Sequence, residues 1–189
     1  MRMTKKEAIE RGIIKPPKRS SPDKREKVSI SSLNKKRRLT KLEKLQASVS
    51  KIRKTDFGFT FDSDSLPSSM NVVLGMHGLE WNKYAKAWKK LANDSVLEAG
   101  RFKQDESWVI VRLTRAGKKS MGDLDGIIVK PIIDGMVLAG VFTDDNPEVF
   151  KVSPFIVQSR GTKDALSIEF HAGSETFLSA VTEHVNTCL

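Results

Sequence analysis

Hydrophobic and polar positions alternate in distinct ways along the chain, and each pattern predicts an element. Phe57, Phe59 and Phe61 alternate with smaller residues, as in a half-buried strand. Residues 81–98 have the period of an amphipathic helix, with apolar side chains on one face and lysines on the other. The apolar face comprises Trp81, Tyr84, Ala85, Trp88, Leu91, Ala92 and Val96, and the lysine face comprises Lys83, Lys86, Lys89 and Lys90.

Downstream patterns predict four more elements. They are a strand over 108–113, a helix over 127–139 that stops at Gly140, and strands over 149–158 and 165–171 on either side of a turn at 160–163. The resulting order is β-α-β-α-β-β. It predicts an α+β fold in which two helices pack on a small mixed sheet.

The N-terminal part of the chain has a different composition. Residues 1–55 hold 19 Lys and Arg against 5 Asp and Glu, which gives +14, whereas the rest has 33 − 19 = 14 basic against 23 − 5 = 18 acidic residues, which gives −4. We therefore expect a basic tail over 1–55, largely disordered or helical, and a folded domain over 56–189. Apolar residues at helical spacing predict that 40–54 forms an amphipathic helix.

The overall charge limits the class of partner. A net charge of +10 favours a polyanion, such as nucleic acid or an anionic membrane face. We find neither a long apolar segment nor a secretory signal, so we expect a cytoplasmic protein with no membrane partner. Cys188 is the only cysteine, which excludes a disulfide framework and a multi-cysteine zinc site. His77, His171 and His184 lack metal-ligand or triad spacing and are interpreted as structural or surface residues.

The main chemical signal lies between positions 122 and 145, where two pairs of aspartates flank one lysine. An extended backbone would project Asp123 and Asp125 to the same side, about 6 to 7 Å apart. A helix and a glycine turn precede Asp144 and Asp145, so a chain reversal would bring all four carboxylates together. Such oxygen ligands suit Mg²⁺ or Mn²⁺, and Lys130 would stabilise charge on a phosphate during phosphodiester hydrolysis. Taken singly, both segments are ordinary turns.

This constellation resembles the RusA-type Holliday junction resolvases, in which Asp-x-Asp-Asn is followed by a lysine, then by Asp and Gly, then by Asp-Asp. The matching positions are Asp123, Asp125, Lys130, Asp134, Gly140, Asp144 and Asp145. The segment Pro67–Asn71 is similar to the Pro-Ser-x-Asn loop after the family's first strand. The resemblance covers about 56–171.

The resemblance implies a homodimer that resolves four-way DNA junctions by paired nicks with Mg²⁺, as bacterial or phage enzymes of DNA recombination and repair do. It further implies that Asp123, Asp125 and Asp145 bind the metal, that Asp144 assists and that Lys130 lies at the scissile phosphate. The expected DNA contacts are Asn71, Arg115, Lys118, Lys119 and the basic run Lys35, Lys36, Arg37 and Arg38.

Two departures from the family pattern leave an alternative open. Gly126 stands where the family has Asn, and one extra residue precedes Lys130, which would make Gly126 the N-cap of the following helix. An altered loop of this kind favours a junction-binding or duplex-binding protein of the same fold that lacks catalysis. An exchange of roles between Asp144 and Asp145 also stays open.

Overall fold

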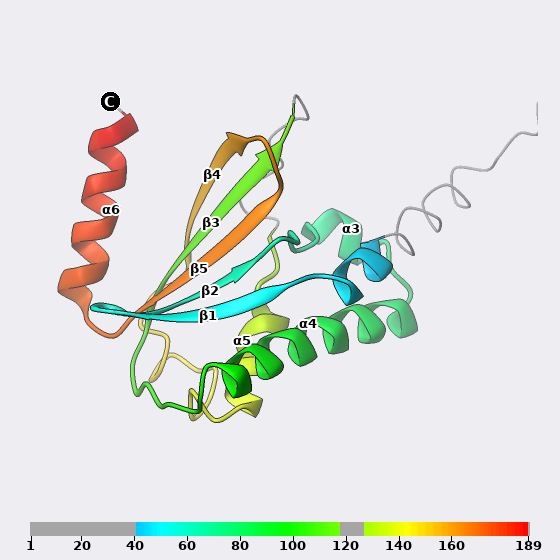
Figure 1. Cartoon of the computed structure of the whole chain (residues 1–189), viewed down its shortest axis with the longest axis horizontal. Coiled ribbons are helices and arrows are strands. Elements are labelled where there is room, and N and C mark those ends of the chain that lie inside the picture. The colour runs from blue at the N-terminus through cyan, green and yellow to red at the C-terminus, as the bar shows by residue number, and fades with distance from the viewer. Residues whose placement is uncertain (1–40, 118–126, 189) are drawn as a thin grey trace, which may run out of the picture. The chain divides into compact units, whose positions relative to one another are not determined.

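The computed structural model describes residues 41–117 and 127–188, and these residues belong to one compact unit. Residues 41–46 are helical. The elements that follow, shown in Figure 1, are β1 (Ser50–Thr55), β2 (Gly58–Ser63), α3 (Met70–Leu74), α4 (Gly78–Glu98), β3 (Trp108–Ala116), α5 (Lys130–Leu138), β4 (Phe155–Gly161), β5 (Ala165–His171) and α6 (Ser174–Cys188).

The strands form one mixed sheet in the order β1-β2-β5-β3-β4. Among the strands of the described residues, β3 and β4 pair in parallel, since α5 lies between them in the sequence and carries the chain back across the sheet. The other neighbouring strands are antiparallel. The expected α+β fold with a mixed sheet is therefore confirmed.

One face of the sheet carries the hydrophobic core, and α4 and α5 cover it. Alternate residues of β2, β3 and β5 point to this face, as the two-residue period of a strand requires. They are Phe59, Phe61, Val109, Val111, Leu113, Leu166, Ile168 and Phe170, and they meet Tyr84, Trp88, Ala92 and Val96 of α4 and Ile132 and Met136 of α5. The amphipathic pattern over 81–98 therefore predicted the buried face of α4 correctly.

The helices α4 and α5 approach each other closely at Gly135. A Cβ atom built on Gly135 would lie 2.5 Å from the Lys89 carbonyl oxygen and 2.8 Å from the Ala92 Cβ. Only a residue without a side chain therefore permits this contact between the two helix backbones. The close approach places side chains of α4 beside the first turn of α5.

The opposite face of the sheet carries a cluster of polar side chains and contacts α6. Arg112 donates from Nε to Glu169 Oε1 at 2.5 Å, and His171 Nε2 lies 3.3 Å from Glu169 Oε2. His171 is buried, stacks on Phe57 at 4.2 Å between ring centroids, and contacts the Thr176 hydroxyl of α6. This histidine therefore has the structural role that its sequence context predicted.

Several predicted element boundaries were wrong. Residues 50–54, the second part of the amphipathic helix expected over 40–54, lie in edge strand β1, because the two-residue hairpin turn Asp56–Phe57 pairs this strand with β2. The strand predicted over 149–158 begins only at Phe155, and the turn predicted at 160–163 begins after Gly161. Helix α6 was not predicted. The expected domain start at position 56 lies inside the compact unit.

Within residues 41–117 and 127–188, we find no helix that is both long and apolar enough to cross a membrane. The basic run Lys35, Lys36, Arg37 and Arg38, together with Lys118 and Lys119, lies outside the described residues.

Candidate active site

Helix α5 carries the first candidate residue at its first position. Lys130 begins the helix, Pro131 follows it, and Val129 is the N-cap. Proline suits this place because the first turn has no intrahelical partner for its backbone nitrogen. The expectation that Gly126 caps the helix was wrong, since α5 begins at Lys130, three residues later than the predicted start at 127.

A sharp reversal after α5 returns the chain towards Lys130. Gly140 adopts a φ of 79°, and Val141 donates to the Met136 carbonyl oxygen at 3.0 Å, which closes the helix end. Nine helical residues rise about 13 Å, and the five steps from Gly140 to Asp145 span a similar length when extended. The segment after the helix therefore reaches back to the helix start.

The Lys130 ammonium lies between two carboxylates. It donates to Asp134 Oδ1 at 3.0 Å, one helical turn away, and also to Asp145 Oδ2 in the returning segment. Two-thirds of the Lys130 side chain stays exposed, whereas Asp134 and Asp145 are 21% and 33% exposed. The ammonium is thus held by its carboxylate partners and still faces solvent, where a phosphate could approach it.

Asp134 joins this cluster to α4. Lys89 Nζ lies 2.8 Å from Asp134 Oδ2, so Asp134 bridges two lysines with its two oxygens. Partial burial pushes the pKa of Asp134 upward, but the hydrogen bonds and positive charges of Lys89 and Lys130 outweigh burial and hold it below its ordinary value. Asp134 is therefore an ionised anchor for the two lysines.

Asp144 and Asp145 have different surroundings. Asp144 accepts from the Asp145 backbone N–H at 2.7 Å and from Asn146 Nδ2 at 3.1 Å, so both of its oxygens bond to its own loop. Asp145 instead turns its carboxylate towards Lys130. This arrangement favours Asp145 as the residue that meets a ligand, and Asp144 as the residue that shapes the loop.

The other two candidate carboxylates, Asp123 and Asp125, lie outside the described residues. Among the residues that the structure describes, no three or more His, Cys, Asp or Glu side chains form a group that could hold a metal ion. Ile127, the first described residue after Asp125, makes an isolated β-bridge with Ser69. This bridge fixes the chain three residues before Lys130.

The other expected DNA contacts fall near the same end of the sheet. Asn71 is exposed in α3, two residues after Ser69. Arg115 lies near the end of β3 and is partly buried, and its Nε has no hydrogen-bond partner in the described structure. Arg115 is two residues before Gly117, and the neighbourhood of Asn71 is joined to the residues before α5 by the bridge between Ser69 and Ile127.

Lys89 is the site residue that the sequence did not single out. The helical period placed it on the lysine face of α4, but nothing local indicated that this face would reach α5. The signal that could have identified it is Gly135, because a small residue in a short apolar helix favours close helix packing.

The histidine at the start of α4 has a structural role. His77 is the N-cap, accepts from the Leu79 backbone N–H at 3.4 Å, and forms a capping box with Glu80.

The comparisons with known proteins found no match to a family model, to a curated protein or to a solved structure. The RusA-type resemblance thus depends on the motif residues alone.

Proposed function

We propose that the protein is a Mg²⁺-dependent, structure-selective DNA endonuclease that cuts Holliday junctions or other branched DNA. The observation that carries this proposal is the ion pair of Lys130 with Asp145 across the reversal at Gly140. It unites two parts of a motif that are 15 residues apart in the sequence. A nuclease site needs this combination, with a cation for the phosphate next to a carboxylate for the metal.

Each residue of the described cluster has a role in this proposal. Lys130 contacts the scissile phosphate and stabilises the negative charge that develops on it, while Asp134 and Lys89 hold the first turn of α5 in place. Asp144 fixes the loop that presents Asp145. Lys130 faces solvent, so DNA can reach its ammonium without any rearrangement of the core.

The donor set suits a hard divalent cation. Asp145 offers a partly exposed carboxylate and, with Asp123 and Asp125, would hold Mg²⁺ or Mn²⁺. The bound ion would supply positive charge next to the phosphate and orient the attacking water. A ligand set of this kind would be completed by the segment that contains Asp123 and Asp125, directly before Lys130.

The direct test is nicking of a synthetic four-way junction by the full chain with Mg²⁺. The Asp123→Asn, Asp125→Asn double variant should lose cleavage and keep junction binding. Asp105→Asn is the matched control, because Asp105 is an exposed carboxylate on the loop after α4. Cleavage by the double variant at the wild-type rate would remove Asp123 and Asp125 from the site.

The second candidate function is junction or duplex binding without catalysis. Val129 as the N-cap favours it, because α5 begins later than the motif spacing implied. This candidate predicts salt-sensitive binding and no cleavage with Mg²⁺ or Mn²⁺. Any paired nicking that depends on a divalent ion would exclude it.

A further inference from the structure

The lysine face of α4 is separate from the candidate active site but adjoins it. We infer that Lys83 and Lys86, on the rim of a groove beside α4, bind the phosphate backbone of a duplex DNA arm. That the ligand is DNA rests on the proposed function. The lysines would show where the DNA runs beyond the scissile phosphate.

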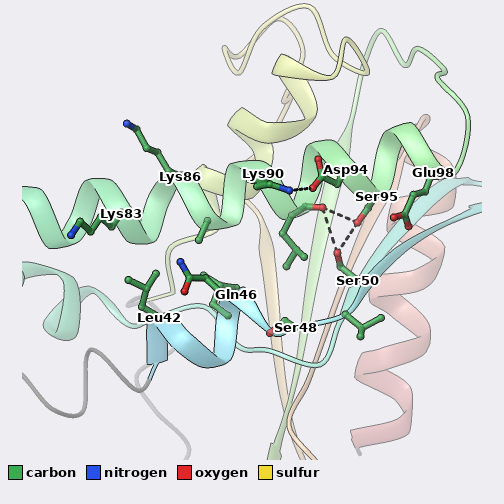
Figure 2. Close-up of a pocket in the computed structure, with 14 residues that line it drawn as sticks. Leu42, Gln46, Ser48, Ser50, Lys83, Lys86, Lys90, Asp94, Ser95 and Glu98 are labelled. Atoms are coloured by element: carbon green, nitrogen blue, oxygen red, sulfur yellow. Dashed lines mark hydrogen bonds and ion pairs between the residues drawn. The ribbon is translucent and has the colours of Figure 1, made fainter.

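A groove runs between α4 and the segment 41–50 (Figure 2). Leu42, Gln46 and Ser48 line one wall, and Lys83, Lys86 and Lys90 line the other. At its floor, Ser50 Oγ lies 2.6 Å from Ser95 Oγ, which joins β1 to α4. This hydrogen bond thus links the two sides of the groove.

Lys83 and Lys86 carry charges that the described part of the chain does not neutralise. Lys89 pairs with Asp134, and Lys90 pairs with Asp94, whereas neither Lys83 nor Lys86 makes an ion pair with any described residue. Both are exposed and lie three residues apart, so they project from neighbouring positions on one helix face. Two cations at neighbouring positions on one helix complement an array of phosphates.

The two ends of the groove carry charges of opposite sign. Asp94 and Glu98 line its other end, towards the C-terminus of α4. An anionic backbone would be repelled there and attracted at Lys83 and Lys86. The expected contact is therefore confined to the N-terminal half of α4.

Two connections relate this face to DNA and to the proposed chemistry. Lys89, one turn from Lys86, contacts Asp134, which in turn holds Lys130. At the opposite wall, the chain enters at residue 41 directly from residues 1–40, which hold 14 Lys and Arg against 4 Asp and Glu. A duplex that follows Lys83 and Lys86 would thus lie between the basic segment's point of attachment and the candidate site.

The experiment compares the salt dependence of duplex and junction binding by the full chain in EDTA, so that no cleavage occurs. The Lys83→Ala, Lys86→Ala variant should bind more weakly, and the slope of log K against log salt should become shallower by about 1.8, since each lost phosphate contact removes about 0.9. The control variant is Lys54→Ala, Lys103→Ala. It removes two exposed lysines that do not line the groove, and its slope should equal that of the wild type.

A Lys83→Arg, Lys86→Arg variant should restore the slope, because the contact depends on positive charge. An unchanged slope in the alanine pair, or an equal change in the control pair, would overturn the inference. The inference would also be overturned if the alanine pair lost binding to an acidic polypeptide but kept DNA binding, since the occupant of this surface would then be a protein. A wild-type chain that binds but never cuts would refute the nuclease proposal while leaving this surface in place.

Discussion

The Lys130 ammonium hydrogen-bonds the carboxylate of Asp145, a residue 15 positions further along the chain. Helix α5 and the reversal at Gly140 create this contact, because the helix carries the backbone away and the following segment returns it by a similar length. One short helix and the reversal after it are enough to form this contact. The contact joins the start of that helix to the acidic segment after Gly140 at one point on the surface.

Replacement of Lys130 tests its proposed contact with the phosphate. We expect Lys130→Met to lower kcat for junction nicking roughly 100- to 1,000-fold, as loss of one charge-stabilising donor does in other enzymes, with little change in junction affinity. The measurement is single-turnover cleavage together with binding in EDTA. Lys103→Met, an exposed lysine elsewhere, should cleave normally; equal losses in both variants would contradict a specific role.

The sequence predicted the elements whose local pattern agrees with their packing. Strand β5 (Ala165–His171) was predicted at its observed bounds, and the buried face of α4 follows the apolar stripe. Both elements are long or strongly periodic, so burial and local preference point to the same structure.

The errors arose where a distant contact decided the structure. Ile52 fits a helical stripe with Leu42, Leu45 and Val49, yet it lies in β1 because strand β2 supplies paired backbone groups. Helix α6 is rich in valine and threonine, which favour strands over helices, and this weakens its helical signal. The Lys89–Asp134 pair joins two helices and leaves no local pattern at all.

Leu45 tests whether the segment before β1 belongs to the folded unit. The sequence assigned it to the tail, but its side chain is only 3% exposed within the core. We expect Leu45→Ala to reduce the free energy of unfolding by about 2 to 5 kcal/mol, as for other buried leucines. Urea denaturation measures the effect. Val49→Ala is the control, because Val49 is 71% exposed and should change stability by less than about 0.5 kcal/mol.

Truncation addresses the same boundary. A chain that begins at Arg38 should unfold cooperatively, whereas a chain that begins at Asp56 loses β1 and exposes the edge of β2. Equal stability of the two chains, measured by thermal unfolding, would place 38–55 outside the folded unit.

The close approach of α4 and α5 predicts that Gly135→Ala destabilises the protein, although helix propensity alone predicts stabilisation. The higher helix propensity of alanine would raise the free energy of unfolding by up to about 1 kcal/mol. The new Cβ, however, would collide with the Lys89 carbonyl and Ala92. We expect a net loss of about 1 to 2 kcal/mol, because overpacking typically costs about 1 to 3 kcal/mol. Gly78→Ala is the matched control, with no atom within 4 Å of its added Cβ. Stabilisation by Gly135→Ala would show that the helices separate readily.

The final prediction concerns how the stability of the fold depends on pH through the polar cluster of Arg112, Glu169 and His171. Burial raises the pKa of Glu169, but hydrogen bonds from His171 and Arg112 and their charges outweigh burial and hold it below its ordinary value. A depressed pKa means that the folded protein releases the proton more readily than the unfolded chain. The stabilisation by Glu169 is therefore complete above the unfolded pKa of about 4.3 and is lost as pH falls through the lower folded value.

We accordingly expect Glu169→Gln to lower the free energy of unfolding by about 1 to 3 kcal/mol at pH 7. This is the range for a buried hydrogen-bonded charge that loses its partner. Arg112 stays protonated throughout, so the difference from wild type should shrink as pH falls below about 4 and the wild-type carboxyl is neutralised as well. Urea denaturation at pH 7 and pH 3 measures both values. Glu183→Gln, on the exposed side of α6, should show neither the loss nor its pH dependence. If the Glu169→Gln deficit were the same at both pH values, lost packing rather than lost charge would explain it.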